Sequence, residues 1–138
     1  MNGRARRRGV RLLALLAVVT VGLGSRSQAV WIPTFVASHA GDALYATAAY
    51  LALSLAAPRL AMRAAFLAAL AFCLLIEGSQ AVEHPILAWL RGLPGGRLVL
   101  GQGFDPADPG RYFVGALAGV AIDRALPWRR LPSSTATD

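Results

Sequence analysis

At 138 residues, 56% of them hydrophobic and 15% charged, the chain is far more apolar than a soluble domain. This composition favours a small, single-domain, all-α membrane protein. The formal net charge is +7, and all 14 basic residues are Arg. They stand at the ends of apolar runs without interleaved aromatic residues, so the pattern argues against nucleic-acid binding. The single Cys73 lies inside an apolar run, which excludes an intrachain disulfide and predicts a buried, unreactive thiol.

Four apolar runs predict a four-helix transmembrane bundle in residues 10–128. The expected helices cover residues 10–24, 40–57, 62–82 and 111–126, approximately. The first helix follows a basic cytoplasmic segment, residues 1–9, and a cleaved signal peptide is the alternative, because Ser27-Gln28-Ala29 has the spacing that a signal peptidase reads. We prefer an uncleaved helix. Residues 129–138 are small and polar, which predicts a disordered cytoplasmic tail.

The arginines also predict an orientation in the membrane. Most of them flank the N-terminus, the connection between the second and third helices, and the C-terminus. The positive-inside rule therefore places both termini in the cytoplasm of a bacterial inner membrane. The arginines left on the opposite side are Arg26, Arg91, Arg97 and Arg111. With this topology Asp42 begins its helix at the outer face, where Glu77 and Gln80 end theirs.

Glu77-Gly78-Ser79-Gln80 places a carboxylate and a carboxamide on one face of an apolar helix. An isolated charge at membrane depth costs about 2.5–3.5 kcal/mol or more, so it is a functional-site hypothesis by default. We expect a ligand pocket of acidic, amide and Arg residues near the outer face. Its candidate residues are Asp42, Tyr45, Glu77, Gln80, His84, Arg91, Arg97, Asp108 and Tyr112. The alternative is that these charges pair only to fix helix packing.

A long connection separates the third and fourth predicted helices. Residues 85–93 are amphipathic and predict a short helix in the outer interface. Residues 97–104 are too few to cross the bilayer, which leaves a re-entrant segment as an alternative. Arg91 and Arg97 flank glycines and form a weak candidate phosphate site. No ligand pair has a recognised metal spacing, so no metal or cofactor is predicted, and His84 is expected to be a hydrogen-bonded structural residue.

Gly115 and Gly119 form a GxxxG pair that lets a neighbouring backbone approach closely. The partner is expected to be another helix of this chain, and the alternative is a homo-oligomer. Asp123 lies one turn further along the same stripe. We expect it to pair with Arg124 or Arg59.

Several motifs follow one another in a recognisable order. They are Gly41-Asp42-Ala43-Leu44-Tyr45-Ala46 with Tyr50, then Glu77-Gly78-Ser79-Gln80, Arg91, Leu98-Val99-Leu100-Gly101-Gln102-Gly103-Phe104, and Asp108 with Tyr112 and Gly115. Their order resembles domain-of-unknown-function family 2809, a family of small bacterial integral membrane proteins. It is more distantly similar to VanZ-like proteins, in which a Glu-x-x-Gln at a helix end precedes an Arg and an Asp that opens the last helix.

The resemblance covers about residues 12–123. It implies four transmembrane helices with the polar residues gathered at one end, and it makes the first helix part of the domain. The VanZ branch is associated with tolerance to teicoplanin, a glycopeptide that acts on the cell envelope. This sequence departs from the pattern at Pro106 and Pro109, which predicts a last helix beginning near residue 111 and leaves the direction of Asp108 open.

Three functional hypotheses follow. The leading one is a pocket that recognises a lipid headgroup or a lipid-linked envelope intermediate. The second is a small transport protein in which Asp42 and Glu77 relay protons or bind a cation, and the third is a non-catalytic assembly partner. An enzyme has little support, because Ser38 and Ser79 have no base at a recognisable spacing.

Overall fold

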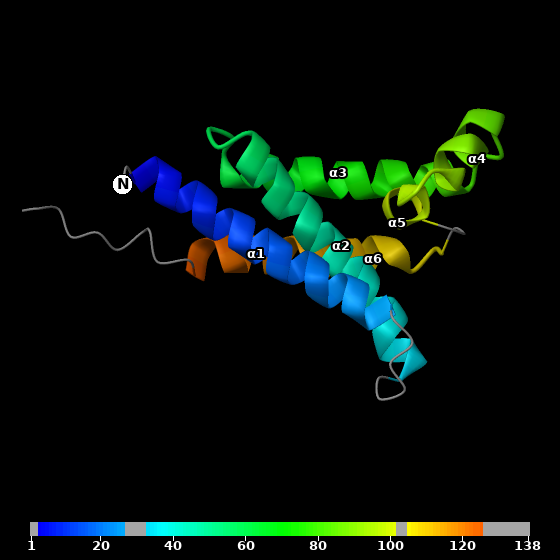
Figure 1. The fold of residues 1–138 in the computed structure, drawn as a ribbon, viewed down its shortest axis with the longest axis horizontal. Helices are drawn as coiled ribbons and strands as arrows, with labels where there is room; N and C mark the ends of the chain where they lie inside the picture. Colours follow the sequence, from blue (N-terminus) through cyan, green and yellow to red (C-terminus); the bar gives the residue numbers. More distant parts are fainter. Residues whose placement is uncertain (1–2, 27–32, 102–104, 126–138) are drawn as a thin grey trace, which may run out of the picture.

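The computed structural model describes residues 3–26, 33–101 and 105–125, and every regular element among them is helical (Figure 1). The helices are α1 (Gly3–Arg26), α2 (Thr34–Ala56), α3 (Met62–Gln80), α4 (Pro85–Gly92), α5 (Gly96–Leu100) and α6 (Asp108–Ala125). The predicted all-α class is confirmed for this part of the chain. The expected tail at 129–138 and the peptidase motif at 27–29 lie outside the described residues.

The four long helices alternate in direction. In Figure 1, α1 and α3 run one way while α2 and α6 run back between the same two ends. Helix α2 packs against α1, α3 and α6, and α3 also contacts α6. Because the directions alternate, the start of α2, the end of α3 and the start of α6 share one end of the bundle.

Helices α2 and α6 both begin earlier in the chain than the sequence predicted. Helix α2 begins at Thr34, directly after Pro33, so His39 and Asp42 lie inside the helix. Helix α6 begins at Asp108, earlier than the expected residue 111. Pro109 falls in its first turn, where the missing N–H removes no intrahelical bond. The prolines therefore start α6 and do not delay it.

On α3, small side chains face the interior of the bundle and several large apolar ones face outward. Ala65 and Ala69 of α3 are buried, whereas Leu67 and Leu75 of the same helix are 62% and 73% exposed. Helices in lipid pack in this way, because small residues let backbones approach. Within the described residues, two segments are long and apolar enough to cross a membrane, Ala5–Ser25 and Met62–Gln80.

Helices α2 and α6 approach each other closely at the glycine pair. A Cβ atom on Gly115 would lie 2.0 Å from the carbonyl oxygen of Ala43, and one on Gly119 would lie 2.8 Å from Cδ1 of Tyr50. The Thr47 hydroxyl also donates to the carbonyl oxygen of Gly115 over 2.7 Å. The pair therefore joins α6 to α2 of the same chain, and this contact does not require a second copy.

The connection between α3 and α6 holds two short helices. Helix α4 matches the amphipathic helix expected at 85–93, and the side chain of His84 caps its first turn by accepting from the Ile86 N–H over 3.2 Å. Helix α5 occupies part of the segment predicted to be re-entrant and packs against α3 and α4. Residues 102–104 of that segment lie outside the described residues.

Candidate ligand pocket

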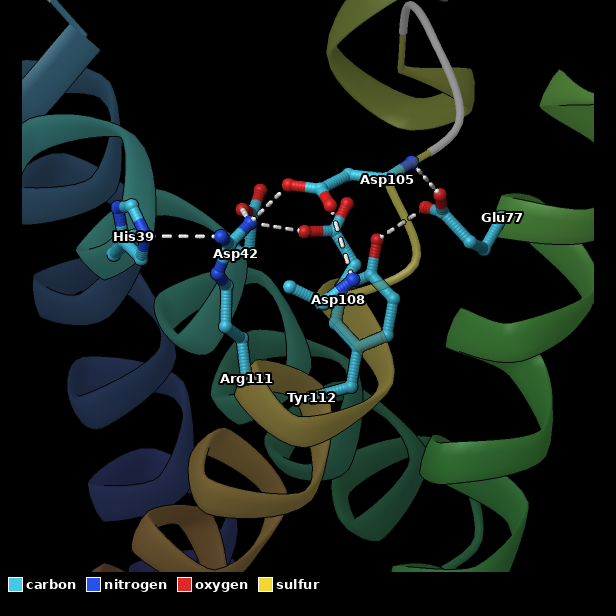
Figure 2. A network of polar contacts seen from close by, with 8 residues as sticks. His39, Asp42, Glu77, Asp105, Asp108, Arg111 and Tyr112 are labelled. Atoms are coloured by element: carbon cyan, nitrogen blue, oxygen red, sulfur yellow. Dashed lines mark hydrogen bonds and ion pairs between the residues drawn. The ribbon is translucent and has the colours of Figure 1, made fainter. Parts of the chain in front are cut away.

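Arg111 lies at the centre of a polar cluster at the end of the bundle where α2 and α6 begin (Figure 2). Its Nη1 atom donates to Asp42 Oδ2 over 3.3 Å, to Asp105 Oδ2 over 3.0 Å, and to Asp108 Oδ1. Its Nη2 atom lies 2.9 Å from His39 Nε2. Because a guanidinium can only donate, His39 accepts through Nε2. One cation therefore faces three carboxylates.

Asp105 connects this cluster to the turn that precedes α6. Its carboxylate accepts from the Ala107 N–H over 3.0 Å, and its carbonyl oxygen accepts from the Asp108 N–H over 3.0 Å. The Ala107 N–H, together with the Arg111 guanidinium, holds the pKa of the Asp105 carboxyl below its usual value. Asp105 is thus a charged turn residue that positions Asp108 and Arg111.

Glu77 links α3 to both α6 and the turn. It is only 2% exposed, and each of its carboxylate oxygens has a donor. Oε1 accepts from the Asp105 N–H and Oε2 from the Tyr112 hydroxyl, both over 2.8 Å (Figure 2). A buried carboxylate needs such partners, because leaving it without them costs several kcal/mol.

A cavity of about 360 Å³ opens beside this cluster. Its lining residues come from α2, α3, α5, α6 and the segment after α5: Asp42, Tyr45, Ile76, Gln80, Arg97, Leu98, Val99, Gly101, Asp108 and Tyr112. Carboxylates, a guanidinium and an amide therefore face the same space as three aliphatic side chains. Such a mixed lining is typical of a ligand site.

Helix α5 is held over the cavity by two contacts. The Tyr45 hydroxyl donates to the carbonyl oxygen of Val99 over 2.8 Å, which joins α5 to α2. Gly101 ends α5 with φ +66°, and a Cβ atom there would lie 2.3 Å from Nε2 of Gln80. Glycine is needed at this position both for its backbone conformation and for the close approach of Gln80.

The structure brings most of the predicted pocket residues together. Six of them line the cavity: Asp42, Tyr45, Gln80, Arg97, Asp108 and Tyr112. Glu77 lies next to it, bonded to Tyr112. His84 and Arg91 lie elsewhere, since His84 caps α4 and Arg91 donates to the carbonyl oxygen of Ser79 over 2.9 Å. Arg97 therefore lines the cavity, whereas Arg91, on the other side of the glycines, is bonded to the end of α3.

Sequence reasoning did not include Arg111, Asp105 or His39 in the pocket. For two of these residues the sequence does carry a signal, a spacing of three residues from a predicted pocket residue. Arg111 follows Asp108 by three residues, and His39 precedes Asp42 by three, so each pair shares a helix face. Asp105 gave no comparable signal, because Pro106 separates it from the helix and suggested an interruption.

The cluster is not arranged as a metal centre. Among the residues that the structure describes, no group of three or more His, Cys, Asp and Glu side chains is placed to hold a metal ion. The Arg111 guanidinium occupies the point where three carboxylates meet.

A second polar cluster lies at the opposite end of the bundle, and it corrects the expected partner of Asp123. Asp123 is 2% exposed and accepts from Arg11 of α1, whose Nε and Nη2 atoms lie 2.8 Å and 3.0 Å from its two oxygens. Arg11 also donates to the carbonyl oxygen of Ser54 over 2.8 Å. The expected pairing with Arg59 or Arg124 was wrong, because α1 packs closely enough to supply its own Arg. Cys73 is fully buried, as predicted.

The chain was compared with known protein families and structures. No solved structure matches it. The family described as "Protein of unknown function (DUF2809)" matches residues 31–116, which includes α2 to α5 and the start of α6. This match covers every named residue of the cavity lining and more than half of the chain, and the protein therefore belongs to the DUF2809 family.

Proposed function

We propose that this protein is a polytopic inner-membrane protein whose cavity binds the headgroup of a lipid or of a lipid-linked envelope intermediate. In this proposal α1, α2, α3 and α6 cross the bilayer and both termini are cytoplasmic. The four helices have 18 to 24 residues. At 1.5 Å per residue these lengths correspond to about 27–36 Å, compared with about 30 Å for the hydrocarbon core.

The exposed surface supports a lipid environment. Large apolar side chains point outward from three of the long helices, including Leu13 of α1 (68% exposed), Leu75 of α3 (73%) and Val114 of α6 (61%). The interior instead holds buried charges at both ends, Glu77 and Asp123. So many exposed large apolar side chains are unusual on a soluble monomer, and lipid chains would cover them.

The observation that carries the ligand proposal is the lining of the 360 Å³ cavity. Charged and amide groups face it beside Ile76, Leu98 and Val99. A packing role alone requires the charges to neutralise each other and leaves no space beside them. A lipid headgroup fits this lining, because its charged groups can pair with the polar side chains. The glycerol or acyl chains next to the headgroup can contact the aliphatic side chains. The resemblance to VanZ-like proteins favours the cell envelope as the source of the ligand.

A pair of neighbouring substitutions tests the proposal. Ile76→Trp places an indole in the cavity, whereas Leu75→Trp places it on the exposed face of the same helix. The full chain is purified in mild detergent, and retained lipid is measured by native mass spectrometry. Wild type and Leu75→Trp should retain a defined lipid that Ile76→Trp loses. Equal retention in all three proteins would contradict the proposal.

A second candidate is proton- or cation-coupled transport, and the gathering of carboxylates beside the cavity favours it. Asp42, Asp105 and Asp108 converge on Arg111, so a proton or cation entering there would meet several carboxylates at once. The protein is reconstituted in liposomes, and flux is measured across a pH gradient. Transport requires flux that Glu77→Gln reduces, while an absence of flux in wild type would remove this candidate.

A further inference from the structure

We propose that a second cavity, at the opposite end of the bundle, binds the phosphate of an anionic phospholipid. This basic cavity has a volume of about 240 Å³ and is lined by Arg7, Arg11, Tyr50, Ser54, Leu60, Met62 and Asp123. The inference goes beyond the ligand proposed for the first cavity and uses only the membrane-spanning arrangement of that proposal. In that arrangement the basic cavity lies at the cytoplasmic leaflet.

The basic cavity is formed by the whole bundle. Its lining residues come from all four long helices and from the connection between α2 and α3, which holds Leu60. Asp123 and Arg11 are bonded to each other there, and the Tyr50 hydroxyl donates to Asp123 Oδ2 over 3.4 Å. A ligand in this cavity is therefore placed to contact side chains from every long helix.

Arg7 is the residue that fits a phosphate. It is exposed, lines the basic cavity, and forms no hydrogen bond or ion pair with another residue in the described part of the chain. Arg11 lies four residues later on the same face of α1, and it is already bonded to Asp123 and to the carbonyl oxygen of Ser54. A guanidinium can donate two parallel hydrogen bonds to phosphate oxygens, so Arg7 can bind the phosphate while Arg11 keeps its own partners.

Arginines dominate the charge at this end of the bundle. Five more of them are exposed there, outside the cavity lining: Arg6, Arg8, Arg59, Arg63 and Arg124. Within the described ranges, Asp123 is the only acidic residue at this end. Such an excess of positive charge attracts anions and favours a headgroup with a net negative charge over a zwitterionic one. Basic pockets between helices on the cytoplasmic side of a membrane bind anionic headgroups for this reason.

Apolar side chains near Arg7 favour a lipid as the source of the phosphate. Leu60 lines the basic cavity and is 41% exposed, and Met62 lines it as well. On α1, Leu12 and Leu13 follow the arginines in the chain and are 45% and 68% exposed. The glycerol and acyl chains of a phospholipid can contact such side chains, whereas a soluble phosphate ester makes no use of them.

Lipid titration followed by native mass spectrometry tests the inference on the full-length, delipidated protein in detergent. The probes are phosphatidylglycerol and phosphatidylcholine with identical chains, and glycerol 3-phosphate as the soluble ester. We expect wild type to bind phosphatidylglycerol about tenfold more tightly than phosphatidylcholine, because only the first has a net negative charge. Glycerol 3-phosphate should bind more weakly than phosphatidylglycerol.

Two neighbouring substitutions separate a built site from general attraction by positive charge. Arg7→Gln should weaken phosphatidylglycerol binding by about tenfold, because it removes the paired hydrogen bonds to the phosphate. Arg8→Gln is the matched control, since it removes the same charge from an exposed residue outside the cavity lining. It should weaken binding by no more than about threefold, because solvent screens a charge that does not contact the ligand. Melting temperatures without lipid should be those of wild type in both variants.

Three results would overturn the inference. If Arg7→Gln and Arg8→Gln weaken phosphatidylglycerol binding equally, the arginines attract the lipid only as a diffuse charge. If phosphatidylcholine or glycerol 3-phosphate binds as tightly as phosphatidylglycerol, the ligand is not an anionic lipid. If Ile76→Trp abolishes phosphatidylglycerol binding and Arg7→Gln does not, the lipid occupies the first cavity, and the proposed function stands alone.

The opposite outcome separates the two proposals in the other direction. If Arg7→Gln weakens phosphatidylglycerol binding, while wild type and Ile76→Trp retain the same lipids, the basic cavity is confirmed and the proposed function of the first cavity falls.

Discussion

The Tyr112 hydroxyl donates a 2.8 Å hydrogen bond to Oε2 of Glu77, and both side chains are buried. This bond joins the start of α6 to the end of α3, two helix ends that the chain separates by α4 and α5. It also gives the buried Glu77 carboxylate one of its two donors, the other being the Asp105 N–H. The bond therefore holds one wall of the cavity in place.

Removal of the Tyr112 hydroxyl tests this bond. Tyr112→Phe leaves a buried carboxylate oxygen without its donor, and we expect the free energy of unfolding to fall by about 2 kcal/mol. Thermal unfolding in detergent measures the change. Tyr45→Phe is the matched control, because its hydroxyl bonds the Val99 carbonyl in an exposed position and should cost less than about 1 kcal/mol. Equal effects of both substitutions would contradict the role of Glu77.

Arg111 is expected to hold the aspartates together. Arg111→Gln removes the cation shared by Asp42, Asp105 and Asp108, and should lower the free energy of unfolding by about 3 kcal/mol. Adding Asp108→Asn to that variant should restore part of the loss, since it removes one of the repelling charges. Thermal melts of the single and double variants check this, and a double variant less stable than Arg111→Gln would count against the charge argument.

The contact between α2 and α6 should not tolerate a larger residue at Gly115. The Cβ atom added by Gly115→Ala would lie 2.0 Å from the Ala43 carbonyl oxygen, so the two backbones must separate. We expect a loss of roughly 1–3 kcal/mol in thermal unfolding. Gly110→Ala in the first turn of α6 is the control, since nothing lies within 4 Å of its added Cβ. An unchanged melting temperature for Gly115→Ala would show that this contact is looser than described.

At the opposite end, Arg11 and Asp123 should be energetically coupled. Their two parallel hydrogen bonds and the burial of Asp123 predict a coupling free energy of about 2 kcal/mol. A double-mutant cycle of Arg11→Gln and Asp123→Asn, followed by thermal unfolding, measures it. Additive losses would mean that α1 is attached to α6 by other contacts.

The proposed topology can be tested with two single cysteines. Ala57 follows α2 and Ala81 follows α3, and both are exposed at opposite ends of the bundle. In a Cys73→Ala background, a membrane-impermeant maleimide added to cells with an opened outer envelope should label Ala81→Cys. It should label Ala57→Cys only after the inner membrane is permeabilised. The reverse pattern would invert the topology, and labelling of both would remove the four-span arrangement.

The sequence predicted which end of the bundle holds the polar residues better than it predicted the contacts between them. Glu77 and Gln80 lie in the last turn of α3 and Asp42 lies in the first half of α2, so alternating helix directions alone bring them to one end. The role of Arg111 was missed because it depends on three carboxylates from separate segments converging on one side chain. Asp123 was assigned to nearby Arg residues because sequence distance does not reveal that α1 packs along α2 and brings Arg11 to it.

The headgroup proposal, which is the central claim, is tested most directly by an experimental structure of the protein in a lipid bilayer. The cavity that Gln80, Arg97 and Asp108 line should contain headgroup density beside Leu98 and Val99. A cavity filled only by water, or closed by its own side chains with every lipid kept outside, would contradict the claim.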